Sequence, residues 1–335
     1  MTDAAEILVS AALSIHNRSD LFARALHGYA WQTMPADRWE IVLVDDMSTE
    51  DLRAAYGPWI GKMNLLHVRI NHQRHPVWLE RNLGWHTGEP EDWYHTPAIT
   101  TNVGIALSRG RVLCLCHPEI LHAPANFERA SLRLGDQNEK SFLFGTTWLG
   151  KPTSTPALRM STRIWTERGW EGFLRWIRPE IERKFQPNEL YWYTSFLPRA
   201  AAAHVRGVDF GFLNGVAGED DDFKYRVHNA GWCAVHAPEI EGFHQDHTHE
   251  QEAHRNRTTE RWQEALEENR TLLRRKSKEG YSPLANVDCD WAALATIESA
   301  TRFSVGSVVP EEIDPRTLGI VPLDNHAITS YPLRR

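Results

Sequence analysis

The sequence predicts an α/β fold in which a mixed, mainly parallel β-sheet is flanked by helices and followed by a C-terminal helical extension. Two observations lead to this prediction. Short apolar runs alternate with amphipathic helical segments, which is typical of βαβ units with right-handed crossovers. Polar residues also follow directly where several of the apolar runs end. With 335 residues, of which 41% are hydrophobic, the chain can bury one large core or two modest ones.

The apolar pattern locates the elements of the first half. Residues 7–15 form the first expected strand, which ends at His16-Asn17-Arg18, and Ser19-Asp20 can cap the helix that follows. Between residues 71 and 99, four histidines and three tryptophans break the pattern, and a connection of this length indicates a functional loop or lid. The same reasoning predicts further strands at 39–44, 65–70, 111–116 and 141–147, and helices at 102–108 and 127–134.

The second half is less regular. Residues 191–197 and 233–237 have extended patterns, and 222–229 is expected to form a helix that ends at Gly231. A charged helix then reaches Lys278. We expect the Pro- and Asp-rich tail beyond it to wrap the surface or to contact a second copy of the chain in a homodimer.

Charge and cysteine content argue against several classes of protein. The net charge of −7 and the pI near 6.2 disfavour a broad nucleic-acid surface, so anionic ligands would be held by a metal ion or a few placed cations. The four cysteines include no C-x-x-C pair, which disfavours a zinc ribbon or a disulfide framework and fits a reducing compartment. The run 7–15 lacks the basic flank of a signal peptide, and we expect a cytoplasmic protein without a membrane span.

An acidic run, Glu219-Asp220-Asp221-Asp222, stands between Gly218 and the apolar residues Phe223 and Val227. One interpretation is a solvated turn that caps the following helix. The other is functional: apolar anchors hold the helix in a core, so that its first-turn carboxylates are aimed at a ligand. The helix dipole favours ionised carboxylates there, as a general base requires.

Polar residues also end two predicted strands, Asp45-Asp46 in one case and His117-Pro118-Glu119 in the other. Ligands of open α/β sheets bind beyond the carboxyl ends of strands, where carboxylates can hold a ribose, a base or a divalent ion. A third group, Gly242–His249 (GFHQDHTH), is either a surface histidine patch or a site for Mn²⁺ or Zn²⁺. The chain has no H-E-x-x-H, G-x-G-x-x-G or Walker A sequence, which disfavours zincins, dinucleotide dehydrogenases and P-loop enzymes.

Taken in order, these segments resemble glycosyltransferase family 2, whose members have the GT-A fold, and the C-terminal box is also similar to galactosyltransferase-type and chondroitin-polymerase-type enzymes. The similarity covers residues 7–250. It rests on four segments: Leu13–Arg18, Val42–Thr49 (VLVDDMST), Asn102–Gly110 and Gly218–Arg226 (GEDDDFKYR), of which the last is the most specific. In the first segment His16 stands in place of a tyrosine. At the third, Thr101 and Ser108 replace an arginine and an alanine.

The resemblance implies a metal-dependent, inverting transfer from a nucleotide-sugar, most commonly a UDP-sugar, with Mn²⁺ or Mg²⁺ as cofactor. It implies that Asp220 is the catalytic base and that Glu219 orients the acceptor. The donor-binding residues would be Asn17, Arg18, Asp45, Asp46, Asn102 and His117, and the metal ligands Glu119, His244 and His247. The chain then divides into a GT-A domain, 1–250, with a nucleotide half (1–125) and an acceptor and catalytic half (126–250), and a C-terminal helix and tail, 251–335.

The chain departs from the family where His117-Pro118-Glu119 stands in place of the metal-binding D-x-D. Glu119 would bind the ion through its carboxylate, while His117 either joins as a nitrogen ligand or faces the diphosphate. His244 and His247 are rivals for the histidine ligand.

Two other functions stay open. A nucleotidyltransferase or metal-dependent phosphohydrolase also uses strand-end carboxylates, although Ile15–Asp20 lacks the glycines of a phosphate loop. The altered D-x-D favours a catalytically inactive sugar-nucleotide-binding or scaffold protein. The sequence does not specify the acceptor, which could be a glycan, a lipid-linked intermediate, a metabolite, a protein or a modified nucleobase.

Overall fold

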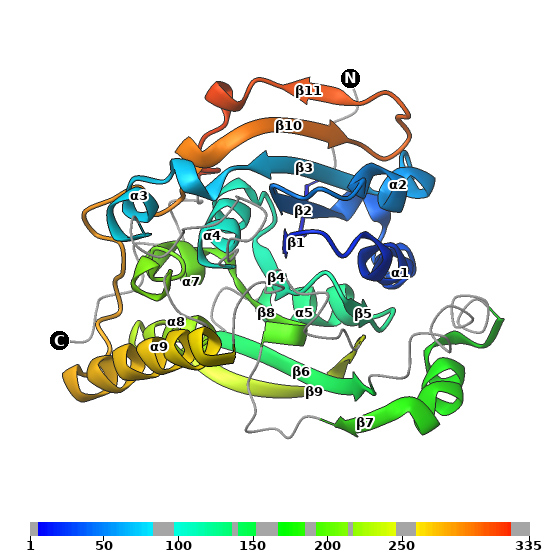
Figure 1. The fold of residues 1–335 in the computed structure, drawn as a ribbon. Helices are drawn as coiled ribbons and strands as arrows, with labels where there is room; N and C mark the ends of the chain where they lie inside the picture. Colours follow the sequence, from blue (N-terminus) through cyan, green and yellow to red (C-terminus); the bar gives the residue numbers. More distant parts are fainter. Residues whose placement is uncertain are drawn as a thin grey trace.

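The computed structural model contains one mixed β-sheet with helices packed on both faces (Figure 1). It describes residues 6–82, 97–135, 140–151, 167–184, 192–213, 217–245 and 259–322. The sheet has eleven strands in the order β11-β10-β3-β2-β1-β4-β8-β6-β9-β5, and β7 pairs with β6. The predicted α/β class is therefore confirmed.

The elements follow one another along the chain with these bounds. The strands are β1 (Val9–Ile15), β2 (Trp39–Asp46), β3 (Asn64–Ile70), β4 (Val112–Cys116), β5 (Ile120–His122), β6 (Ser141–Gly150), β7 (Ile181–Lys184), β8 (Ser195–Pro198), β9 (Cys233–His244), β10 (Ile297–Phe303) and β11 (Glu311–Ile313). The α-helices are α1 (Ser19–Ala30), α2 (Leu52–Tyr56), α3 (Pro76–Asn82), α4 (Pro97–Leu107), α5 (Asn126–Gly135), a helix at 167–177, α7 (Arg199–His204), α8 (Glu219–Asn229) and α9 (Thr259–Glu279). The short 3₁₀ helices used below are η3 (His72–Arg74), η6 (Trp192–Thr194) and η7 (Phe210–Phe212).

The parallel core lies where the sequence predicts it. Strands β3, β2, β1 and β4 are neighbours and run parallel, and β6 and β9 form a second parallel pair. Antiparallel strands join the two groups and extend the sheet at both ends. Ile15 is the Cα partner of Asp45, and Leu13 that of Cys116, so the carboxyl ends of β1, β2 and β4 lie at the same edge.

The two faces of this core carry different helices because successive strand residues point to opposite sides. Val9, Ala11, Leu13 and Ile15 pack with apolar residues of α1 and α5. Ala12 packs on the other side with a cluster that includes α4, α7 and α8. Burial on both faces explains why β1 and β2 are continuous apolar runs in the sequence.

The C-terminal region is part of the same sheet. Residues 297–303 form β10, which pairs antiparallel with β3, and β11 pairs with β10 at the sheet edge. Helix α9 lies beside α8 (Figure 1) and contacts η7. The sequence predicts that this tail wraps the surface or contacts a second copy. Strands β10 and β11 are instead part of the chain's own sheet, where β10 supplies hydrogen-bond partners to the outer edge of β3, while a contact with a second copy stays a prediction.

The irregular stretch 71–99 is in part helical. Helices η3 and α3 occupy its beginning, and α4 starts at Pro97, earlier than the predicted 102. Trp78 is 3% exposed and packs on His72, so it belongs to the core. The remaining residues of the proposed lid, including Trp85 and Trp93, lie outside the described residues.

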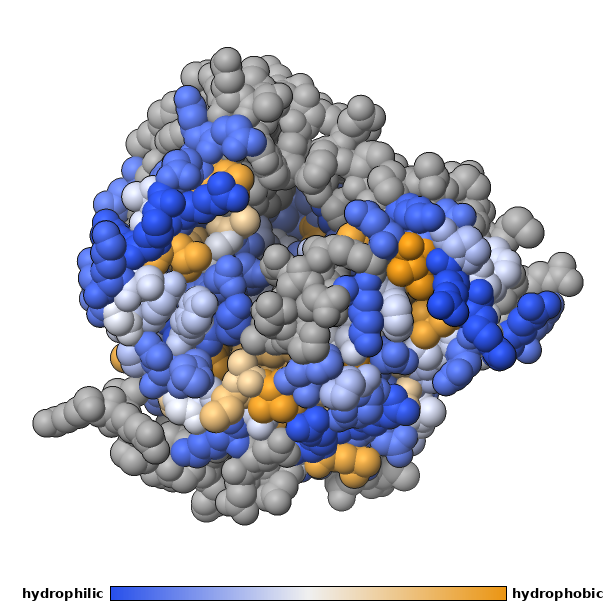
Figure 2. All heavy atoms as spheres, turned by 90° about the horizontal axis from the view of Figure 1, so that it is seen from below, coloured by the Kyte–Doolittle hydropathy of each residue, from blue (hydrophilic) through white to orange (hydrophobic). Residues whose placement is uncertain are grey.

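The described residues on the face seen from below are mainly hydrophilic (Figure 2). The apolar residues on this face form small separate groups between polar ones (Figure 2). Within the described ranges, no helix has the length and apolar character needed to cross a lipid bilayer.

Candidate active site

Three loops meet beyond the carboxyl ends of β1, β2 and β4. His16 Nδ1 lies 2.7 Å from the carbonyl oxygen of Asp46, and the backbone N–H of Asn17 donates to Ser48 Oγ over 2.8 Å. Arg18 Nη1 is 3.3 Å from Glu119 Oε2. The residues that the sequence predicts at strand ends are thus brought together by the segment 16–18.

Asn17 shapes the turn that follows β2. Its φ of 57° lies in the left-handed region, which asparagine tolerates better than most residues. Its side-chain Oδ1 accepts hydrogen bonds from the backbone N–H groups of Thr49 (2.9 Å) and Glu50 (3.2 Å). The polar side chain therefore fixes the loop that presents Asp46 and Ser48.

Asp45 and Asp46 face opposite sides of the sheet. Asp46 is 1% exposed, and its Oδ1 lies 2.8 Å from His72 Nδ1 on the α4 side. Asp45 lies on the α1 and α2 side, where it accepts from the N–H of Ser48 (2.8 Å) and pairs with Arg69 (3.2 Å). A ligand on one face of the sheet can therefore reach only one of these two carboxylates.

The surroundings of Asp45 favour its ionised form. Burial raises the pKa of this carboxyl, but hydrogen bonds from His67 and Ser48 outweigh burial, so that the pKa is lowered. Asp45 also lines a pocket of about 270 Å³ whose wall includes Arg53, Tyr56 and Arg69. This pocket lies on the face opposite to Asp46.

Glu119 is the centre of the candidate metal site. It is 1% exposed, and its Oε1 lies 3.4 Å from His244 Nε2 and 3.7 Å from His117 Nδ1. The ring of Tyr193 packs against both imidazoles, with centroids 4.6 Å from His244 and 5.5 Å from His117. A carboxylate and imidazoles are donors that Mn²⁺ accepts, but in the described residues these three side chains do not bring their ligand atoms all within 4.8 Å of one another, and Arg18 pairs with Glu119. His247, the alternative ligand, lies outside the described residues.

A buried glutamine fixes the backbone at Glu119. Gln245 is 0% exposed and donates from Nε2 to the carbonyl oxygen of Glu119 over 3.0 Å. Its Oε1 accepts from Arg24 Nε of helix α1 over 2.6 Å. Sequence reasoning gave Gln245 no role, because neither of these partners is near it in the chain. Since Gln245 directly follows His244, it holds both candidate ligands in place.

The acidic run at the start of α8 divides into two pairs with different surroundings. Asp221 accepts from Lys224 Nζ over 2.6 Å, and Asp222, 0% exposed, accepts from Arg226 Nε over 2.6 Å. Among the described residues, neither Glu219 nor Asp220 has a cation within ion-pair distance. Within the described residues, Glu219 and Asp220 thus make no ion pair, whereas Asp221 and Asp222 each pair with a cation.

The protonation of the first pair reflects this arrangement. Burial and the neighbouring Asp220 raise the pKa of Glu219 to about 8. Burial and Asp221 raise the pKa of Asp220 to about 6. At neutral pH, Glu219 therefore carries a proton that it can donate in a hydrogen bond, while Asp220 is ionised and can accept one.

Helix η6 connects these carboxylates to the metal candidates. The indole of Trp192 packs edge-on against Phe223 of α8, with centroids 5.1 Å apart. The next residue, Tyr193, packs against His244. Two adjacent aromatic residues thus contact the acidic helix on one side and the Glu119 group on the other.

Asn102 has both ends of its amide occupied within the protein. It is 0% exposed, donates to the carbonyl oxygen of Val208 (2.9 Å) and accepts from the N–H of Val208 (2.7 Å). A Cβ on Gly207, whose φ is 68°, would collide with this amide. Asn102 therefore holds the turn that leads towards α8.

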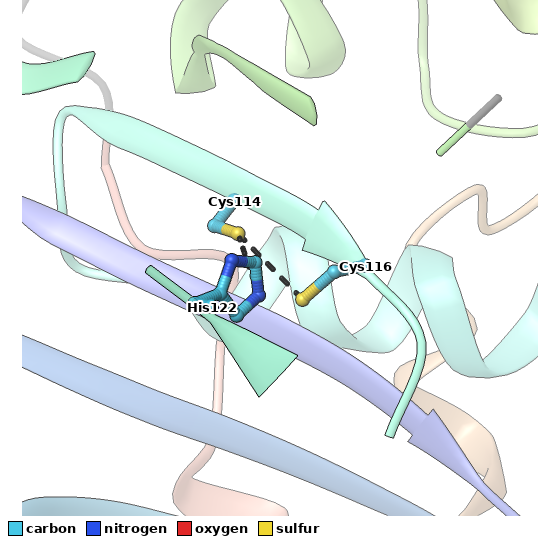
Figure 3. A group of neighbouring side chains, drawn as sticks. All are labelled: Cys114, Cys116 and His122. Carbon is cyan, nitrogen blue, oxygen red and sulfur yellow. Dashed lines mark hydrogen bonds between the residues drawn. The ribbon is translucent and has the colours of Figure 1, made fainter. Parts of the chain in front are cut away.

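A second polar group lies in the core beneath the site. Cys114, Cys116 and His122 are the one set of three Cys, His or acidic residues in the described ranges whose ligand atoms all lie within 4.8 Å of one another (Figure 3). Cys114 Sγ is 3.6 Å from Cys116 Sγ and 4.0 Å from His122 Nε2. Burial raises the pKa of Cys116, but hydrogen bonds from Cys114 and His122 outweigh it and lower the pKa to about 5.

The tautomer of His122 argues against metal binding by this group. The Asn126 amide donates to the carbonyl oxygen of Glu241 (2.6 Å) and accepts from its N–H (3.1 Å), which fixes its orientation. The Asn126 amino group then faces His122 Nδ1 at 3.3 Å. Nδ1 must accept this bond, so Nε2 carries the proton and points it at the sulfur atoms.

The chain matches no protein-family profile, and no curated protein is significantly similar to it in sequence. Similar solved structures include the complex of S. aureus TarS 1–349 with UDP, at 12% identity over 73% of this chain and 62% of that one, with a TM-score of 0.47. The complex of TarS 1–349 with UDP-GlcNAc is 12% identical over 77% of this chain and 64% of that one, with a TM-score of 0.48. The mannosyltransferase PcManGT from Pyrobaculum calidifontis, in complex with GDP-Man and Mn²⁺, is 16% identical over 72% of this chain and 59% of that one, with a TM-score of 0.45. The chain spans about three fifths of the length of these proteins, and with TM-scores below 0.5 the likeness is a distant one.

Proposed function

We propose that this chain is a metal-dependent, inverting glycosyltransferase of the GT-A type, related to family 2, that uses a nucleotide-sugar donor, a UDP-sugar. One observation carries the proposal: Glu219 and Asp220 lie, partly buried, in the first turn of an anchored helix without an ion-pair partner in the described part of the chain, and burial raises the pKa of both. Trp192 packs against Phe223 of the same helix, and the adjacent Tyr193 packs against His244 of the Glu119 group. A solvated cap would not require two carboxyls with raised pKa values.

In this proposal, Asp220 acts as the base. Its pKa of about 6 leaves it ionised at neutral pH and basic enough to take a proton from an acceptor hydroxyl as that oxygen attacks the anomeric carbon. Glu219, still protonated, donates a hydrogen bond that orients the acceptor. Attack from the face opposite the leaving nucleotide inverts the anomeric configuration.

The residues of the strand-end loops would bind the donor. Asp46 is the carboxylate on the α4 side, Asn17 shapes the loop that follows it, and Asn102 holds the turn at Val208. Arg18 lies beside Glu119 and can turn to the diphosphate. Glu119 and His244, with His117, would hold Mn²⁺ or Mg²⁺, which neutralises charge on the leaving nucleotide.

The decisive experiment measures release of the nucleoside diphosphate from a panel of nucleotide-sugars, with Mn²⁺ or with chelator. Water serves as a slow substitute for the acceptor, so the acceptor need not be known. We expect release from one donor, lost with chelator and lost in Asp220→Asn. Asp221→Asn, at a neighbouring carboxylate paired with Lys224, is the matched control and should retain activity at neutral pH, with the acidic limb of its pH profile moved to lower pH because Asp221 raises the pKa of Asp220.

Three outcomes decide between the functions. Release that depends on Mn²⁺ and on Asp220 supports the transferase and identifies the donor. If a nucleotide-sugar binds but no nucleoside diphosphate is released, and no candidate acceptor induces its release, the result supports the inactive binding protein instead. No binding of any nucleotide-sugar would refute both.

A further inference from the structure

Helix α8 starts without a side-chain cap of its own. Its N-cap is Gly218, with φ 91°, and the preceding Ala217 has φ 60°. Two successive left-handed residues are a conformation that the chain does not hold by itself. The constraint comes from α9: Asn269, 1% exposed, donates from Nδ2 to the carbonyl oxygen of Ala217 over 2.7 Å.

A lysine of α9 makes a second connection. Lys276 Nζ lies 2.5 Å from Asp222 Oδ1 and 2.5 Å from Asp209 Oδ2. The other oxygen of Asp222 is held by Arg226, whose guanidinium also donates to the carbonyl oxygens of Val205 and Gly207. Asp222 is therefore bound on both sides in a buried, charge-assisted network.

Lys276 joins two segments of the chain that precede and begin α8. Asp209 accepts from the N–H of Gly211 at the start of η7, while Asp222 lies in the first turn of α8. Lys276 thus connects η7, which precedes α8 in the chain, with the first turn of α8. It also gives Asp222, the last of the four acids, a second cation partner beside Arg226, whereas Glu219 and Asp220 make no ion pair within the described residues.

We propose that Lys276 is a positioning residue for the transfer step: through Asp222 and Asp209 it fixes the direction in which α8 presents Glu219 and Asp220, and Asn269 fixes the start of the helix. The inference rests on the proposed function of α8. It brings residues of the C-terminal region, outside the segment that resembles family 2, into the catalytic apparatus without contact with substrate.

The test compares steady-state nucleotide release by the full chain and by Lys276→Met, using the donor that the wild type hydrolyses. We expect kcat to fall roughly 10- to 100-fold, the range seen when a reacting group is slightly misplaced. KM for the donor should stay within about twofold, because the donor residues lie on other elements and their binding is unaffected. Lys276→Arg, which keeps the charge, should restore most of kcat.

Two controls separate this role from general stability. Lys278→Met changes an exposed lysine two residues away on the same helix and should behave as wild type. The folded fraction of each variant is counted by stoichiometric nucleotide binding, and kcat is expressed per binding site. Asp222 keeps its bond to Arg226 in Lys276→Met, so the variant should fold; should it not, Asn269→Ala provides the test, with a fall in kcat at unchanged KM expected.

The possible failures are distinguishable. A wild type that releases nucleotide from no donor refutes the proposed function itself. An active wild type with a Lys276→Met variant whose kcat per binding site is unchanged refutes the positioning role alone. The same conclusion follows if the loss of activity only tracks the loss of folded protein, or if Lys276→Arg is as impaired as Lys276→Met.

Discussion

Replacing Asp220 with asparagine should make the protein more stable and, at the same time, inactive. The raised pKa means that the folded state binds the Asp220 proton more tightly than the unfolded chain, in which the pKa is 3.8. Above the folded pKa of about 6, ionised Asp220 therefore costs stability. Asparagine has no charge to bury and removes this cost.

The size of the gain follows from the shift. A displacement of about two pKa units corresponds to roughly 3 kcal/mol for a fully buried group. The Asp220 side chain is only half-buried, and solvent screening reduces this to about 1–2 kcal/mol. The gain is fully present above pH about 6 and disappears as the pH falls through 3.8, where Asp220 is protonated in both states.

Urea unfolding of wild type and Asp220→Asn at about pH 8 and about pH 5, followed by circular dichroism, measures the difference. Asp221→Asn, at a more exposed and ion-paired carboxylate, should change stability by no more than about 0.5 kcal/mol. The reasoning is refuted if Asp220→Asn is no more stable than wild type at the higher pH, or if its gain is the same at both. An equal gain would mean that ionisation of Asp220 is not its source.

The same two carboxyls predict the pH dependence of nucleotide release. Activity should rise through pH about 6 as Asp220 loses its proton and becomes a base. It should fall through pH about 8 as Glu219 loses the proton that orients the acceptor. The expected result is a bell-shaped pH profile of kcat with limbs near these two values. A kcat that stays constant from below about pH 6 to above about pH 8 would contradict the assignment of both residues.

Three further substitutions test the surrounding structure. Asp222→Asn should cost about 3–5 kcal/mol in urea unfolding, because it leaves Arg226 buried without its anion; a change below about 1 kcal/mol would contradict this. Gly207→Ala should cost about 2–4 kcal/mol, because its φ of 68° is unfavourable for alanine and the new Cβ meets the Asn102 amide; melting temperatures suffice to detect it. Glu119→Gln should weaken Mn²⁺ binding at least tenfold in calorimetric titration, since an ion bound as proposed would lose its carboxylate ligand; unchanged binding would place the metal elsewhere.

The sequence predicted the parallel core well because the physical signal there is local. Strands β1 and β2 are buried on both faces and read as continuous apolar runs. Strand β10 was missed because its buried residues, Ile297, Ala300 and Phe303, recur at every third position and give no strand alternation, and its pairing partner β3 is far away in the chain. Strand β9 extends beyond the predicted 237 to His244 for a similar reason: Pro238 and Glu239 interrupt the apolar pattern, while pairing with β6 and β5 continues the strand.

The candidate site was predictable in part. That the strand ends meet at one edge follows from parallel pairing, and the structure brings Arg18, Glu119 and His244 together accordingly. The separation of Asp45 from Asp46 could also have been predicted, since neighbouring residues of a strand face opposite sides. The contact of Lys276 with Asp222 could not, because 54 residues separate them and no local pattern links the two.

The pairing of β3 with β10 also governs how the chain acquires its structure during synthesis. β1, β2 and β3 are complete once residue 70 has left the ribosome, but the outer edge of β3 finds its partner only when 297–303 has been made. Until then the nascent chain presents an open row of backbone donors and acceptors to its neighbours. We therefore expect chaperone binding to the nascent chain to persist until residues 297–303 can pair with β3.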